Sequence, residues 1–267
     1  MLNPYLPPEL LDYIVDSLHD DPNALKKCCL VSKSWVPRTR KHLFAEVEFS
    51  TEERLELGKT AFPNPSTSPF RFARSLRVTH AHVIKAAGAE AGGWLRGFSR
   101  IVHLGVETRD MYFGNSETVV SLTPFYGFAQ TVKSLRVGSV FFSPSRIFDF
   151  ILSFPLLEDL AVTNYNPSGD EGGSDSGGSS AAVRPSNPPV FTGTLELRLR
   201  EGLRPIAGWL LSLPGGVRFR KLTLTWLCGE DIQLTTALVG ECSNTLESLD
   251  IICGLSGVSV RYQGTNR

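Results

Sequence analysis

The chain has 267 residues, of which 42% are hydrophobic, enough for a globular protein with a substantial core. Lysine plus arginine and aspartate plus glutamate number 27 each, a balance that argues against partners bound mainly by charge, such as nucleic acid or a membrane surface. No stretch reaches the roughly 18 apolar residues that a membrane helix needs, and the N-terminus lacks a secretory pattern. The five cysteines have no regular spacing, which indicates reduced thiols and a location in the cytoplasm and/or nucleus.

Residues 1–49 contain three short helical patterns. Pro7 and Pro8 suit the start of the first helix, where a missing N–H costs nothing. Asp20 or Asp21 can cap the second, and the third carries Trp35 and ends near residue 44. The first helix has an apolar stripe at helical spacing, made of Leu10, Leu11, Ile14, Val15 and Leu18.

Three sequence clusters in this region occur in a familiar order: LPPELL at 6–11, LVSKSW at 30–35 and HLF at 42–44, followed by a short extended segment. Together they resemble an F-box, over about a sixth of the chain. Ser32 stands where that family often has cysteine. The resemblance implies docking onto a Skp-type adaptor and, through it, a cullin of an SCF-type ubiquitin ligase. The adaptor-binding residues it implies are Leu6, Pro7, Pro8, Leu10, Leu11, Ile14, Leu30, Val31 and Trp35.

The size of this segment is consistent with docking. So short a unit buries too little surface to be stable alone, so several of its apolar residues must cover something else. The alternative is that all of them belong to an internal core. Residues 50–71 follow as a linker, with a charged, mildly helical part at 51–59 and a loop rich in Pro, Ser and Asn at 62–69.

Residues 72–253 repeat a short apolar alternation seven times. The steps between the first apolar residues of successive copies are 28, 31, 25, 37, 25 and 27. This period with L-x-x-L-x-L strands is typical of leucine-rich repeats, whose stacked copies share a core. The copies start at Leu76, Leu104, Leu135, Leu160, Leu197, Leu222 and Leu249.

The predicted fold is therefore an α+β or α/β solenoid, with a three-helix module followed by irregular repeats on a parallel sheet. Helical returns are expected at 144–154, 203–213 and 232–242. The 37-residue step contains a low-complexity insertion at 164–189, which is predicted to be disordered. The tail at 254–267 offers no closing repeat or polar cap.

No catalytic motif stands out in the sequence. A nucleophile elbow and a phosphate-binding loop are both missing. Cys28 and Cys29 are adjacent and are best interpreted as core residues. His80, His82 and His103 could share one face of neighbouring strands, but they lack a fourth metal ligand and are better explained as polar surface. No cofactor and no metal are predicted.

The exposed face of the predicted sheet is more informative. The residue between the two apolar positions of each strand points away from the core, and three of these residues are Arg77, Arg136 and Arg198. Their outer neighbours include Asp159, Glu196, Arg200 and Lys221. Because arginine matches carboxylate and phosphate geometry, this row suggests an acidic or phosphorylated ligand. A charged, solvated strand face is the alternative.

Two functions remain open from the sequence. In the first, the chain is a non-catalytic substrate receptor of an SCF-type ubiquitin ligase, which holds an unknown protein substrate on its repeats and involves neither nucleic acid nor membrane. Tethering would raise the effective concentration of the substrate near the ubiquitin-loaded enzyme. In the second, it is an interaction scaffold not linked to ubiquitination. An enzyme with an N-terminal docking module would need a catalytic cluster that the sequence does not reveal.

Overall fold

The structure is a computed structural model that describes residues 7–80, 82–84, 92–107, 121–138, 144–164, 189–199, 203–227, 231–253 and 259–263. It is an α/β protein built on one sheet, in which each described strand lies beside its neighbours in the sequence, in the order β1 to β9. The strands are β1 Glu46–Phe49, β2 Ser75–Thr79, β3 His103–Glu107, β4 Ser134–Gly138, β5 Asp159–Thr163, β6 Thr194–Arg198, β7 Lys221–Leu227, β8 Ser248–Cys253 and β9 Ser259–Gln263.

Helices connect the strands and precede the first of them. They are α1 Pro8–Ser17, α2 Pro22–Val31, α3 Val36–Leu43, α4 Glu52–Ala61, η1 Pro69–Phe72, α6 Gly92–Leu95, η2 Thr123–Phe128, α7 Pro144–Leu152, α8 Leu203–Leu211 and α9 Ile232–Cys242. Within the described part of the chain, no helix is long and apolar enough to cross a membrane.

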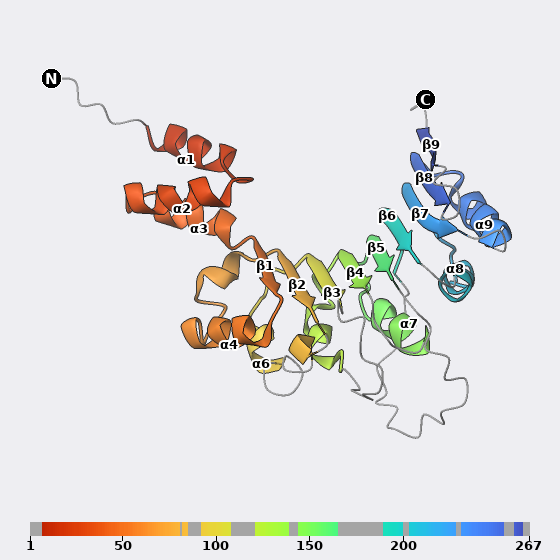
Figure 1. Cartoon of the computed structure of the whole chain (residues 1–267), viewed down its shortest axis with the longest axis horizontal. Coiled ribbons are helices and arrows are strands. Elements are labelled where there is room, and N and C mark those ends of the chain that lie inside the picture. Colours follow the sequence, from red (N-terminus) through yellow and green to blue (C-terminus); the bar gives the residue numbers. More distant parts are fainter. Residues whose placement is uncertain are drawn as a thin grey trace.

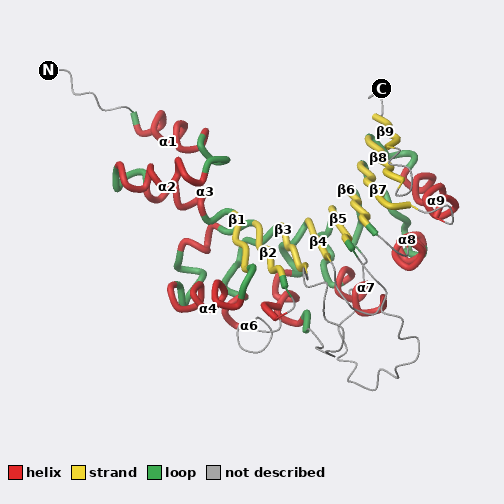
Figure 2. Tube along the Cα trace, viewed as in Figure 1, coloured by secondary structure: helices red, strands yellow, loops and turns green. Residues whose placement is uncertain are grey.

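The sheet is curved, and the helices from α4 onward lie along its outer side (Figure 1). Strands β1 to β8 pair in parallel, whereas β9 pairs with β8 in the antiparallel sense. Figure 2 shows the strands as one continuous band along the inner side of the arc, with α1 to α3 beyond the β1 end. We call the inner side, opposite the helices, the concave face.

Alternation along the strands places the core on the helical side of the sheet. Neighbouring strands align their buried leucines in register, as Leu76, Leu104, Leu135 and Leu160 do. Residues between them in each strand point to the concave face, because successive side chains of a strand alternate in direction. Between sheet and helices lie fully buried aromatic rings, which are Phe98, Phe125, Phe128, Phe150, Phe154, Phe191 and Phe219.

The helix boundaries follow the predicted start signals. Pro8 begins α1, and Asp21 caps α2 by accepting hydrogen bonds from the N–H groups of Asn23 and Ala24, at 3.0 and 2.9 Å. Helices α7, α8 and α9 lie within the three predicted helical returns. The third helix begins one residue after Trp35 rather than including it.

The prediction of seven strands is wrong, because the sheet has two more among the described residues. Strand β1 precedes the expected first repeat and pairs with β2 from Glu46 to Phe49. At the other end, β9 covers the edge of β8, although the tail was expected to offer no closing element. Residues 50–71, predicted to be a linker, contain α4 and most of η1, and Leu55 and Phe70 are buried in the same core as the strands.

The predicted alignment of the fifth repeat is wrong by two residues. Leu195 and Leu197, not Leu197 and Leu199, align with Leu222 and Leu224 of β7. The step from Leu195 to Leu222 is thereby 27 residues, equal to the step from Leu222 to Leu249. Most of the insertion predicted to be disordered, residues 165–188, lies outside the described residues.

Candidate functional site

Helices α1 to α3 form a unit with an interior of its own. Val15, Leu25, Cys28 and Thr39 are buried within it, whereas the main core begins at Val47. Helix α3 contacts both α1 and α2, and it also contacts η1. The buried hydroxyl of Thr39 donates a hydrogen bond to the Trp35 carbonyl at 2.7 Å, so the polar group of this side chain has a partner.

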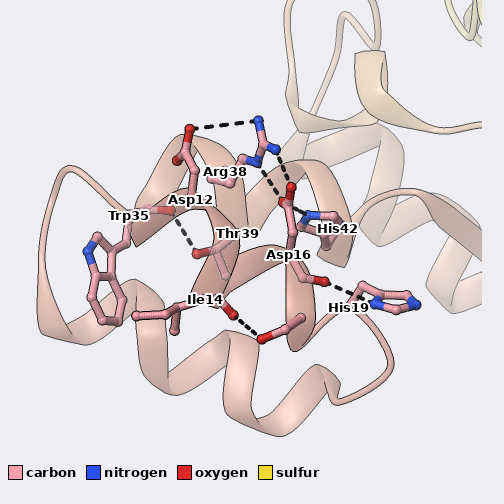
Figure 3. Close-up of polar contacts among 9 residues, drawn as sticks. Asp12, Ile14, Asp16, His19, Trp35, Arg38, Thr39 and His42 are labelled. Atoms are coloured by element: carbon pink, nitrogen blue, oxygen red, sulfur yellow. Dashed lines mark hydrogen bonds and ion pairs between the residues drawn. The ribbon is translucent and has the colours of Figure 1, made fainter. Parts of the chain in front are cut away.

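A charged cluster joins α1 to α3 in this unit (Figure 3). The Asp16 carboxylate accepts hydrogen bonds from Arg38 Nε at 2.6 Å and from Arg38 Nη2, and His42 Nε2 lies 2.7 Å from the same carboxylate. These contacts, with Arg38 the larger cause, hold the pKa of Asp16 far below its usual range. The cluster therefore fixes the position of α1 on α3, and with it the outer surface of α1.

That outer surface of α1 is apolar. Leu10 is 49% exposed, Tyr13 74% and Ile14 38%. The three follow the i, i+3, i+4 spacing of one helix face. Large apolar side chains that gather on a solvent-exposed helix face typically mark a protein interface.

The end of α2 carries a second exposed apolar pair. Leu30 is 88% exposed and Val31 68%, although Leu25 and Cys28 on the same helix are buried. These two groups, Leu10, Tyr13 and Ile14 on α1 and Leu30 and Val31 on α2, are named the α1–α2 surface below. It displays nearly half of the large, clearly exposed hydrophobic residues of the described chain.

The residues that the F-box resemblance implies can now be placed. Pro7 and Pro8 are exposed at the start of α1, Leu11 and Trp35 are half-buried, and Leu6 lies outside the described residues. The described members of the set all keep some accessible surface. Sequence reasoning missed Tyr13, which its position three residues after Leu10 could have revealed.

The arginines predicted to form one row are divided between two rows. Arg77 and Arg136 lie in the row between the two buried positions of their strands. In β6 the residue in this row is Glu196, and Arg198 lies two residues further along the strand, beside Thr163 of β5. Arg77 Nε lies 3.5 Å from Glu107, and Arg136 Nη2 donates a hydrogen bond to Glu196 at 2.9 Å. Lys221 is exposed at the start of β7, and Arg200 lies outside the described residues.

Sequence reasoning did not name Glu107, and it placed Glu196 only as an outer neighbour of the arginine row. Glu107 was left out because it follows its apolar pair. Glu196 was placed outside that row, because the run of alternating residues at 194–199 fits two alignments equally well. Only the pairing with the neighbouring strands distinguishes the two alignments.

The histidines and cysteines do not assemble into a metal site in the described part of the chain, where no group of three or more His, Cys, Asp or Glu could hold an ion. His80 and His82 lie with ring centroids 5.5 Å apart, while His103 is exposed at the start of β3. Cys28 is buried, as predicted for a core residue, and Cys29 is half-buried.

The side chains of the α1–α2 surface are mostly apolar and supply contact area for a partner. No protein-family model, curated protein or solved structure matches this chain.

Proposed function

We propose that the chain is the substrate-recognition subunit of an SCF-type ubiquitin ligase, in which helices α1 to α3 act as an F-box-like module that binds a Skp-type adaptor. The rest of the chain, with its repeated strand and helix units, acts as a leucine-rich-repeat-like solenoid that presents a protein substrate. The chain itself supplies no catalytic group. It accelerates transfer by holding the substrate near the ubiquitin-loaded enzyme, which makes the reaction quasi-intramolecular.

The observation that carries the proposal is the exposure of Leu10, Ile14, Leu30 and Val31. They belong to the set that the F-box resemblance implies, and they lie on a unit whose buried residues are separate from the main core. A single exposed leucine is ordinary, but several large apolar side chains exposed on one small helical unit are typical of an interaction surface. An adaptor with an apolar groove would cover them.

The test is calorimetric titration of a purified Skp-type adaptor into the full chain and into a Leu10→Ser/Leu30→Ser variant. Both side chains are exposed, so the substitutions should leave the fold intact. The matched control is Leu57→Ser/Ile232→Ser, which changes two exposed apolar residues of α4 and α9. We expect the adaptor to bind the wild type and the control with equal affinity and the α1–α2 variant at least about a hundredfold more weakly.

A folded wild-type chain that fails to bind the adaptor would refute the ligase role. The same result would leave an interaction scaffold as the better account, with the α1–α2 surface directed at another helical partner. Loss of adaptor binding in the control as well would show that the effect is not specific to this surface.

A further inference from the structure

Three charged side chains meet near the middle of the concave face. Glu196 of β6 lies between two arginines: its Oε2 accepts a hydrogen bond from Arg136 Nη2 at 2.9 Å, and its Oε1 lies 2.5 Å from Arg198 Nε. We call Arg136, Glu196 and Arg198 the central charge cluster. Among the described residues, Glu196 is the acidic partner of both arginines.

One small residue beneath the cluster explains its geometry. Ala161 of β5 lies in register between Arg136 of β4 and Glu196 of β6, so the arginine side chain crosses a whole strand above a methyl group. A longer side chain at position 161 would stand in the way of this ion pair, since neighbouring strands are only about 4.8 Å apart.

The cluster carries one positive charge in excess. Two guanidinium groups face one carboxylate, and both arginines stay charged at any physiological pH. In the neighbouring pair of Arg77 with Glu107, one positive charge faces one negative charge. The excess charge is accessible, because the Glu196 side chain is 15% exposed whereas those of Arg136 and Arg198 are 41% and 57% exposed.

Each arginine keeps donors for a ligand. A guanidinium group has five N–H donors, and the contacts with Glu196 occupy one nitrogen of each arginine. A carboxylate from outside would therefore meet two guanidinium groups with unused donors, and it would neutralise the excess charge.

We propose that the central charge cluster binds an aspartate or glutamate side chain of an acidic segment in a partner protein, so that Arg136 and Arg198 together hold one carboxylate. The single excess charge matches a carboxylate better than a doubly charged phosphate. That the acidic partner is a ubiquitination substrate rests on the proposed function; the binding itself does not.

The test measures fluorescence anisotropy of a labelled peptide in which glutamate alternates with serine, against a twin with glutamine in place of glutamate. We expect the full chain to bind the glutamate peptide about tenfold more tightly than its twin. The variant Arg136→Gln/Arg198→Gln should lose this preference. Its control is Arg100→Gln/Arg218→Gln, which removes the same charge from two exposed arginines outside the strands and should keep the preference.

A second variant gives a change in the opposite direction. Glu196→Gln removes the competing carboxylate while keeping the side-chain size, so the glutamate peptide should bind several-fold more tightly. Glu52→Gln, an exposed residue of α4, makes the same change in net charge and should have no effect. Circular dichroism of each variant establishes that the fold is retained.

Equal binding of the two peptides, no binding of either, an equal loss in the arginine control, or weaker binding by Glu196→Gln would each overturn the proposal. Adaptor titration on the same preparations separates it from the proposed function. A chain that binds the adaptor but shows no preference for glutamate refutes only the cluster, whereas one that prefers glutamate but binds no adaptor refutes only the ligase role.

Discussion

Two leucines five positions apart on α2 should differ in how much a substitution by alanine lowers the stability of the chain. Leu25 is 1% exposed and Leu30 is 88% exposed. Leu25→Ala leaves a cavity inside the three-helix unit and should destabilise it by about 2 to 5 kcal/mol. Leu30→Ala removes atoms that water already surrounds, so the free energy of unfolding should change by less than about 0.5 kcal/mol.

The affinity for the adaptor, by contrast, should fall when Leu30 is truncated. Truncation of Leu30 removes Cγ and both Cδ atoms, and at about 0.8 kcal/mol for each buried carbon the loss is about 2.4 kcal/mol, or roughly 50-fold in Kd. Nearly all of this energy is available to an interface because so little of the side chain is covered in the free chain.

Urea denaturation and calorimetric titration measure the two effects on the same samples. Hydrogen exchange of α2 amides is the local readout, because the buried residues of α1 to α3 are separate from the main core. If Leu30→Ala destabilised the unit as much as Leu25→Ala does, the assigned exposure of Leu30 would be wrong. If it left both stability and adaptor affinity unchanged, Leu30 would not lie in the interface.

Two further predictions concern titratable groups. Because Arg38 and His42 lower the pKa of Asp16 in the folded chain, their contribution to stability is complete above the unfolded pKa of about 4 and is lost as the pH falls through the folded value. Arg38→Gln should therefore lower the melting temperature of the unit at pH 7, and its difference from the wild type should shrink in acid; a constant difference across this range would contradict the assignment. Burial raises the pKa of the Cys242 thiol, whereas Cys29 is half-buried. Maleimide labelling of the native chain, mapped by mass spectrometry, should modify Cys29 before Cys242, and equal labelling in the absence of urea would count against this.

Sequence patterns predicted the elements whose signals are local. Pro8 and Asp21 mark helix starts through their own local chemistry, and the apolar spacing in α7, α8 and α9 is that of a helix packed on a core. Strands β2 to β5 were also predicted in their observed alignment, because a single alternation of apolar and polar residues defines each of them.

The errors occurred where the deciding information lies in another strand. The segment from Thr194 to Leu199 alternates throughout, so only its pairing with β7 shows that Glu196 belongs in the arginine row. Strand β9 has no leucine repeat and exists through pairing with β8. The proposed docking residues could be named from the resemblance, but the difference in exposure between Leu11 and Leu30 depends on packing that a sequence does not display.

The order of the strands has a consequence for how the chain unfolds. Every described strand pairs only with its neighbours in the sequence, so no strand from one end of the sheet holds the other end in place. Loss of a terminal strand removes one set of pairings, whereas loss of a middle strand such as β5 breaks two and splits the core. Protection of backbone amides against hydrogen exchange should therefore be greatest near β4 to β6 and fall gradually toward both edges. The central charge cluster spans these same three strands, so its side chains are anchored in the part of the sheet that opens last.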